Sequence, residues 1–222
     1  MNNYMIKRVI TLSILMLTFV SCGKQNKTKI ILNYDGETDK TKIFLKEIKV
    51  DREFSIDSVV MKKSGRHTFI IQTNQPRFYK LYFPGGKWIM LLAEPGERIR
   101  LNVSQEKLPF GYEVKGSVSS QFVRELGQRL YHTVRKMDSL RNYYNAIPAD
   151  KQSDSERTRL DSEFKALADS QHRESIRFVL SHYNSLSSIY ALYQKYDDST
   201  WVFYSAKDLQ YFKIASDSLS KK

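Results

Sequence analysis

The sequence predicts an α+β protein, with an N-terminal antiparallel β-sandwich or open barrel of about eight strands and a following α-helical bundle segment. Short segments rich in Ile, Val, Phe and Tyr are separated by turns between residues 29 and 117. After Gly116-Ser117 the apolar spacing changes from two residues to about 3.6, which indicates helices over 118–222. With 41% hydrophobic and 27% charged residues, the chain can bury a core.

Residues 1–21 have the pattern of a lipoprotein signal peptide. Lys7 and Arg8 form a positively charged start, and residues 9–20 are apolar except for Thr and Ser. This run is shorter than the roughly 20 apolar residues that a membrane-spanning helix needs, and polar residues 24–27 follow it. We therefore expect a secretion signal rather than a helical membrane anchor.

The signal ends in Phe19-Val20-Ser21-Cys22, which resembles the lipobox of lipoprotein signal peptidase, with Phe19 in place of the usual leucine. Small Ser21 fits the cleavage position. A cysteine thiolate can take a diacylglycerol as a stable thioether, and Cys22 is the only cysteine of the chain. We expect cleavage between Ser21 and Cys22, a lipidated linker over 22–28 and membrane lipid as a partner; an incidental cysteine beside an ordinary signal is the alternative.

The β-domain is expected over residues 29–117. Its predicted strands are 29–34, 42–48, 54–60, 67–72, 78–83, 88–93, 98–103 and 111–114. Ile99, Leu101 and Val103 alternate with polar residues, as in a strand with one buried face. Pro95-Gly96 suits the centre of a type II turn. No helical pattern separates the strands, which argues against parallel βαβ units.

Four helices are expected in the C-terminal half. The first carries an apolar stripe and stops before Pro148; the stripe consists of Val123, Leu126, Leu130, Val134, Met137, Leu140, Tyr144 and Ile147. The second begins at Ser153, which forms a capping-box pattern with Glu156, and runs to about His182. Its stripe is expected to pack on the first helix and consists of Leu160, Phe164, Leu167, Ile176, Val179 and Leu180. Segments 187–196 and 206–219 are shorter helices.

Aromatic residues around one predicted hairpin are the candidate binding surface. They are Phe78, Tyr79, Tyr82 and Trp88, with Phe83 beside them. Such a cluster can bind a sugar or a peptide, although strand cores use aromatic residues just as readily. The histidines, His67, His132, His172 and His182, form no HxxxH or HExxH pair. We therefore expect no catalytic residue, no metal site and no cofactor.

The chain carries a formal net charge of +12, with its basic residues spread along the sequence. Nucleic acid is not expected as a partner, because export removes the chain from it and the charges form no single basic arm. A positive charge also favours the anionic membrane surface beside a lipid anchor.

Several short motifs follow one another in a characteristic order. Asp57-Ser58 precedes Gly65 and Phe69, Pro76 precedes Tyr79 and Leu81, Glu94-Pro95-Gly96-Glu97 leads into Ile99 and Leu101, and Val114-Lys115-Gly116-Ser117 precedes the helices. Together they resemble the N-terminal region of the TlpA/ResA-like (AhpC/TSA-type) thiol-disulfide oxidoreductase lipoproteins. Phe178-Val179-Leu180 through Leu192 is more weakly similar to the helical segment of that family. The resemblance implies a lipidated cysteine, a β-rich domain of unknown function and helices ahead of a thioredoxin domain.

The family's redox chemistry uses a Cys-x-x-Cys pair, which these 222 residues do not contain. A dithiol mechanism needs an attacking and a resolving thiol, so Cys22 alone cannot run it. We expect a non-catalytic lipoprotein of the cell envelope that acts in interaction or positioning, with an envelope protein as a candidate partner. The sequence around Cys22 has no acidic run, which favours the periplasmic side. The alternatives are the front part of an oxidoreductase and a periplasmic glycan- or peptide-binding module.

Overall fold

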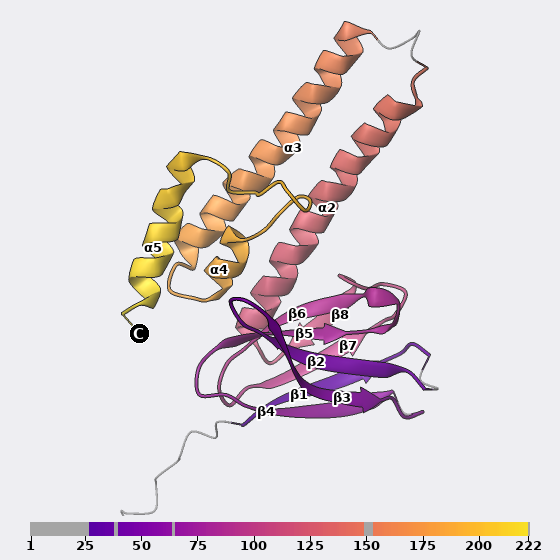
Figure 1. Cartoon of the computed structure of the whole chain (residues 1–222), viewed down its shortest axis with the longest axis vertical. Coiled ribbons are helices and arrows are strands. Elements are labelled where there is room, and N and C mark those ends of the chain that lie inside the picture. The colour runs from indigo at the N-terminus through magenta and orange to yellow at the C-terminus, as the bar shows by residue number, and fades with distance from the viewer. Residues whose placement is uncertain (1–26, 38–39, 64, 149–152, 222) are drawn as a thin grey trace, which may run out of the picture.

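The computed structural model describes residues 27–37, 40–63, 65–148 and 153–221. The expected signal, Ser21 and Cys22 lie outside these residues. The strands are β1 (Lys27–Tyr34), β2 (Lys42–Ile48), β3 (Glu53–Val60), β4 (Arg66–Gln72), β5 (Arg77–Tyr82), β6 (Trp88–Ala93), β7 (Arg98–Val103) and β8 (Tyr112–Lys115). They form two four-stranded sheets, β4-β1-β7-β8 and β3-β2-β5-β6, packed face to face (Figure 1). The predicted α+β class is confirmed, and the β-domain is a sandwich rather than an open barrel.

The sheets are antiparallel apart from one pair, since β1 and β7 run parallel. The chain leaves the first sheet after β1 to form β2 and β3 in the second sheet, and it returns as β4. It repeats this excursion through β5 and β6 before β7 joins the free side of β1. The crossover thus passes through the opposite sheet, so a parallel pair forms without the helix that a βαβ unit requires.

The sandwich core follows from strand alternation. In β7, Ile99, Leu101 and Val103 are buried while the residues between them are exposed, as their spacing predicts. The largest side chains of the core, each less than 2% exposed, include Phe69, Leu81 and Leu91. Gly96 has φ of 82°, which agrees with the type II turn predicted between β6 and β7.

The helical half contains α2 (Val118–Ala146), α3 (Asp154–Ser181), α4 (Ser187–Leu192) and α5 (Leu209–Leu219), with short 3-10 turns η2 (Pro84–Gly86) and η4 (Ala206–Asp208). The hydroxyl of Ser117 accepts from the backbone N–H of Ser120 and caps α2, which ends before Pro148. Ser153 caps α3 by accepting from the Glu156 N–H. The expected capping box is only half right, because the Glu156 carboxylate binds Arg159 at 2.7 Å.

One predicted helix needs correction. The predicted helix 187–196 ends at Leu192, because the chain turns there and residues Lys195 and Trp201 form an antiparallel bridge. Segment 206–219 is helical as predicted, and it starts as a 3-10 turn before α5. In α3, Phe164 lines a groove with Leu140 of α2 but keeps 37% of its surface exposed, and Leu180 is 45% exposed.

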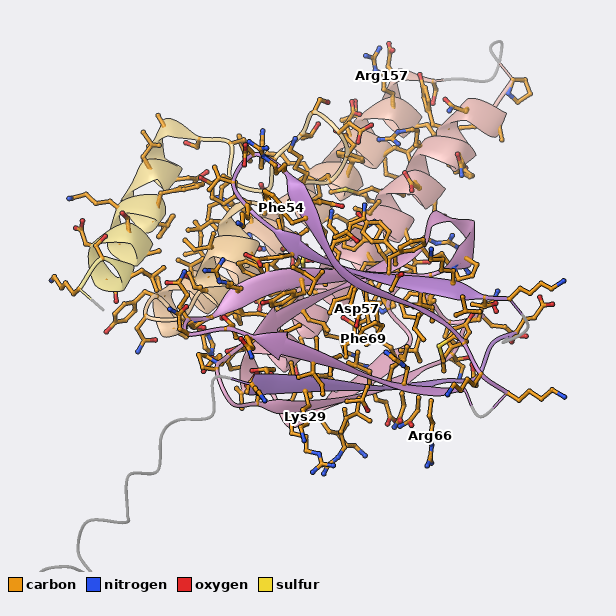
Figure 2. All side chains as sticks on the ribbon, turned by 60° about the horizontal axis from the view of Figure 1, so that its bottom comes forward. Lys29, Phe54, Asp57, Arg66, Phe69 and Arg157 are labelled. Atoms are coloured by element: carbon orange, nitrogen blue, oxygen red, sulfur yellow. The ribbon has the colours of Figure 1, made fainter. Side chains whose placement is uncertain are left out.

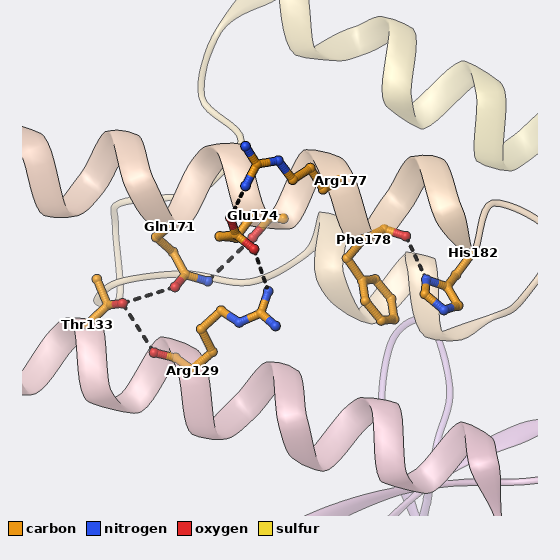
Figure 3. Close-up of polar contacts among 8 residues, drawn as sticks. Arg129, Thr133, Gln171, Glu174, Arg177, Phe178 and His182 are labelled. Carbon is orange, nitrogen blue, oxygen red and sulfur yellow. Dashed lines mark hydrogen bonds and ion pairs between the residues drawn. The ribbon is translucent and has the colours of Figure 1, made fainter.

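Polar residues of α3 are also buried in the helical half, and one of them binds α2. Gln171 and Ser175 are buried in α3, and the Gln171 Oε1 accepts from the Thr133 hydroxyl of α2 at 3.0 Å (Figure 3). The α2–α3 pair is therefore joined by hydrogen bonds as well as apolar contacts, which a stripe of apolar residues alone does not reveal.

The helices are attached to the sandwich through the start of α2. The buried Ser120 hydroxyl donates to the Leu92 carbonyl at 2.9 Å and accepts from the Leu92 N–H at 3.2 Å. Farther along, α2 and α3 form a long hairpin that rises from the sandwich, with α4 and α5 beside its lower half (Figure 1). A second cluster of buried residues joins these helices, and it contains Leu126, Val179, Ala191, Leu192, Val202, Phe203 and Ala215.

Candidate functional site

The predicted aromatic surface divides between two faces of the β5–β6 hairpin. Tyr79 is 2% exposed in the sandwich core and Phe83 is 4% exposed, so neither lies on a binding surface. The expectation for Tyr79 is wrong because alternation along β5 turns it inward together with Leu81. Phe78 faces outward, but it packs against Tyr190 of α4, with 6.3 Å between the ring centroids. Tyr82 and Trp88 remain on the open part of the outer face.

Tyr82 of β5 belongs to a polar cluster centred on Glu53 of β3, which lies two strands away in the same sheet, with β2 between them. The Tyr82 hydroxyl donates to the Glu53 carboxylate at 2.8 Å, Lys80 Nζ donates at 2.8 Å and Lys46 Nζ at 3.3 Å. We call Lys46, Glu53, Lys80, Tyr82 and Trp88 the Glu53 cluster. Three strands, β2, β3 and β5, supply its polar members, because their outward-facing positions meet on one side of the sheet.

Burial and hydrogen bonding set the proton affinities of this cluster. Burial and the hydrogen bond to Glu53 raise the pKa of Tyr82 to about 12. Burial alone raises the pKa of the Glu53 carboxyl, but the hydrogen bonds from Lys80 and Tyr82 outweigh burial and hold this pKa below its usual value. Glu53 is therefore ionised and Tyr82 neutral at neutral pH.

Two cation–π contacts order the aromatic rings. Lys80 Nζ lies 4.5 Å from the centroid of Trp88, and Lys46 Nζ lies 4.7 Å from the centroid of Tyr82. Since both ammonium groups are also bound to Glu53, the rings are placed by a charge network rather than by core packing. Trp88 nevertheless keeps 38% of its surface exposed.

Trp88 also borders a cavity of about 290 Å³ between β6, the β7–β8 loop, α2 and α4. Its walls are Gly86, Lys87, Trp88, Ile89, Met90, Pro109, Phe110, Tyr112, Val123 and Tyr190. The Tyr112 hydroxyl donates to the Met90 carbonyl at 3.4 Å, and burial raises the pKa of Tyr190 to about 12. A mostly apolar cavity with neutral hydroxyls can hold a small apolar or aromatic group, and its volume lies near the lower end of ligand sites.

Two of the histidines, His172 and His182, have structural contacts. His172 Nε2 lies 2.9 Å from Asp208 Oδ1, and the other oxygen of Asp208 accepts from the N–H groups of Tyr204 and Ser205. Asp208 thereby caps η4 and connects α3 to the start of α5. His182 Nδ1 lies 3.0 Å from the Phe178 carbonyl, and its ring stacks on the Phe178 ring (Figure 3). These hydrogen bonds of His172 and His182 include no serine, threonine or tyrosine hydroxyl that could act as a nucleophile.

Sequence reasoning found Tyr82 and Trp88 but missed Glu53 and Asp208. Glu53 precedes the predicted strand 54–60 by one residue, and only the pairing of β2 with β3 and β5 shows that it lies between two lysines. Asp208 was recognisable, because Ser205 and Asp208 have capping-box spacing and the structure contains that box.

Within the described ranges, no group of three or more His, Cys, Asp or Glu side chains is placed to hold a metal ion. None of the described helices has the length and apolar character needed to cross a bilayer. Comparison with protein-family models found no match to this chain, and comparison with curated proteins also found none. The resemblance to TlpA/ResA-like proteins therefore stays a prediction.

Proposed function

We propose that this protein is a lipid-anchored lipoprotein of the cell envelope that binds an envelope component and catalyses no reaction. The N-terminal pattern supports the anchor, since a short apolar run leads directly to Ser21-Cys22 and Cys22 is the only cysteine. The periplasmic side of the membrane is the proposed location, with lipid attached through Cys22. An envelope protein is the proposed partner.

The observation that carries the binding role is Trp88. Its ring is partly exposed at the mouth of an apolar cavity, and it is positioned by Lys80. Tryptophan is enriched among the residues that dominate binding energy, because it supplies a large contact area with little loss of conformational freedom. We infer that an apolar or aromatic side chain of a partner peptide enters the cavity and packs on Trp88.

The α2–α3 hairpin supports a positioning role. With 29 residues, α2 extends for about 43 Å at 1.5 Å per residue. Its upper part and that of α3 carry exposed aromatic residues, among them Tyr143 and Phe164. An arm of this length presents contacts well away from the sandwich that carries it (Figure 1).

The test uses Trp201→Ala as a matched control for Trp88→Ala. Trp201 is also 38% exposed and has Lys195 Nζ at 4.0 Å from its ring centroid, but it lies in the loop after α4. Tryptophan fluorescence and thermal unfolding are measured with a panel of peptides and glycans. We expect a peptide that raises Tm for the wild type and for Trp201→Ala, and no effect for Trp88→Ala. Absence of any ligand, or retained binding by Trp88→Ala, contradicts the proposal.

A second candidate is a periplasmic glycan-binding module. Aromatic faces beside polar groups suit sugars, and Trp88 has Lys80 and Glu53 next to it. In the same panel, this candidate predicts that glycans and not peptides bind, again through Trp88.

The third candidate is that these residues form the front part of a membrane-anchored thiol-disulfide oxidoreductase, as the family resemblance implies. Reading the gene beyond the codon for Lys222 tests this directly. An in-frame thioredoxin domain with a Cys-x-x-Cys pair supports it. We further expect that residues 23–222 do not accelerate the reduction of insulin by dithiothreitol; clear turnover contradicts the non-catalytic proposal.

A further inference from the structure

We propose that the outer face of the sheet β4-β1-β7-β8 docks on a bilayer containing anionic phospholipids. The inference rests on the proposed lipid anchor at Cys22 and adds the surface that meets the membrane. We call this surface the basic face. It is formed by the outward residues of the four strands, and its charged members are Lys27, Lys29, Arg66, Arg98, Arg100, Glu113 and Lys115.

Strand pairing concentrates positive charge on the basic face. Lys29 lies opposite Arg98 in the β1–β7 pair, and Arg100 lies opposite Lys115 in the β7–β8 pair. Like charges placed directly opposite one another destabilise a sheet. Glu113 is the one acidic residue on this face among those that the structure describes, and it lies 4.0 Å from Lys115.

The basic residues on the outer faces of the two sheets differ in whether they form ion pairs. On the outer face of β3-β2-β5-β6, Lys46 and Lys80 both form ion pairs with Glu53. On the basic face, Lys29, Arg98 and Arg100 are exposed, and none of them forms an ion pair with a described residue. Lys29 and Arg66 point away from the same side of the sandwich (Figure 2). Lys29, Arg98 and Arg100 can therefore meet an external anion, and the spread of the basic residues over several strands fits a surface rather than a single ligand.

The chain connection places this face close to the anchor. Five residue steps separate Cys22 from Lys27, the first residue of β1, and they span at most about 18 Å when fully extended. β1 is an inner strand of the basic sheet, between β4 and β7. A diacylglycerol on Cys22 sits in the bilayer, so the start of β1, with Lys27, is held within roughly two Debye lengths of the headgroups.

Docking through this face also orients the rest of the molecule. The α2–α3 hairpin rises from the edge of the sandwich where β6 and β8, the last strands of the two sheets, lie (Figure 1). The cavity beside Trp88 lies at this same edge, so docking through the basic face places the hairpin and the cavity to the side of the membrane contact rather than within it. The lipid anchor sets the distance and the charges set the orientation.

The test measures co-sedimentation with vesicles of phosphatidylcholine alone or mixed with phosphatidylglycerol. Residues 23–222 are used without lipid, because they contain all eight strands and both clusters of buried residues. The basic-face variant is Lys29→Glu, Arg98→Glu, Arg100→Glu. The control, Arg135→Glu, Lys136→Glu, Arg173→Glu, makes the same charge change on exposed helix positions.

We expect the wild type and the control to bind phosphatidylglycerol vesicles, and the basic-face variant to bind at least about 100-fold more weakly. Each Lys or Arg near an anionic surface strengthens binding by about fivefold. Binding should fall when salt is raised from about 0.1 to about 1 M, because the Debye length shrinks from about 10 to about 3 Å. Circular dichroism and thermal unfolding establish that both variants are folded.

Equal losses in the two triple variants show that net charge alone drives binding and overturn the proposal. So does equal binding to vesicles with and without phosphatidylglycerol, or undiminished binding by the basic-face variant. Lipid attachment at Cys22 is scored separately, by mass spectrometry of the protein extracted from membranes. A lipidated protein whose basic face binds no vesicles refutes the docking proposal alone, whereas an unlipidated protein refutes the anchor.

Discussion

The sandwich and the helical half bury their interiors in different ways. The sandwich core is built from side chains such as Phe69, Leu91 and Leu101, which are fully buried and apolar. The interior of the helical half includes buried Gln171 and Ser175, and many of its apolar residues are only half-buried. A sheet packed on a sheet encloses its residues on both sides, whereas a two-helix hairpin leaves one side open. The sandwich is thus the more fully buried frame, and the helices are the more exposed part.

The largest loss of stability is expected from a mutation in the sandwich core. Phe69→Ala removes a fully buried ring from the core and should lower the free energy of unfolding by about 3–5 kcal/mol. Phe164→Ala is the matched change on α3, where the ring is 37% exposed, and it should lower the free energy of unfolding by only about 1–2 kcal/mol. Urea unfolding followed by circular dichroism measures both. Equal losses of unfolding free energy in the two variants would contradict the proposed difference between the sandwich core and the helical hairpin.

The next largest effect should be confined to the helices. Asp208→Ala removes the acceptor for the Tyr204 and Ser205 N–H groups and the partner of His172, and Asp208 is 3% exposed. Leaving buried groups unpaired costs about 1–3 kcal/mol. Hydrogen exchange should become faster in α5 and stay unchanged in β1. The exposed Asp217→Ala is the control. If β1 also exchanged faster, the two regions would unfold as one unit.

A loss of stability of similar size is expected where the regions join. Gly116 has φ of 83°, and a Cβ there would lie 2.2 Å from the Arg98 carbonyl oxygen. Gly116→Ala should therefore cost about 1–3 kcal/mol. Gly85→Ala is the control, because Gly85 has φ of 74° but no atom within 4 Å of the added Cβ. The difference between their unfolding midpoints measures the clash, and equal midpoints would show that the backbone moves aside freely.

The smallest effect concerns the outer face of the sheet β3-β2-β5-β6. Since the pKa of Tyr82 is raised to about 12 in the folded protein, its stabilising contribution is complete below pH 10 and is lost as the pH rises toward 12. Glu53→Gln removes the negative acceptor and should lower this pKa toward the ordinary value of about 10. Near-ultraviolet absorbance of each protein, compared with its Tyr82→Phe counterpart, follows the titration. An unchanged pKa in Glu53→Gln would mean that burial alone controls Tyr82.

Local signals explain what the sequence predicts well. Alternation locates the eight strands, and caps such as Ser117 and Ser153 locate the helix starts, because both depend on neighbours in the chain. The parallel β1–β7 pair and the Glu53 cluster depend on the order of strands in the sheets. The apolar pattern does not reveal how much of Phe164 stays exposed, because few elements cover the outer end of the hairpin. Trp88 is partly exposed, whereas alternation along β5 buries Tyr79.

The central claim is that Cys22 carries the lipid that holds this frame at the membrane. Mass spectrometry of the mature N-terminal peptide from the full chain, expressed in a bacterium with a lipoprotein pathway, tests it directly. We predict a peptide that begins at Cys22 and carries a diacylglyceryl thioether, and none in Cys22→Ala, which should retain its signal. A mature peptide that starts elsewhere, or an unmodified Cys22 thiol, would contradict the claim.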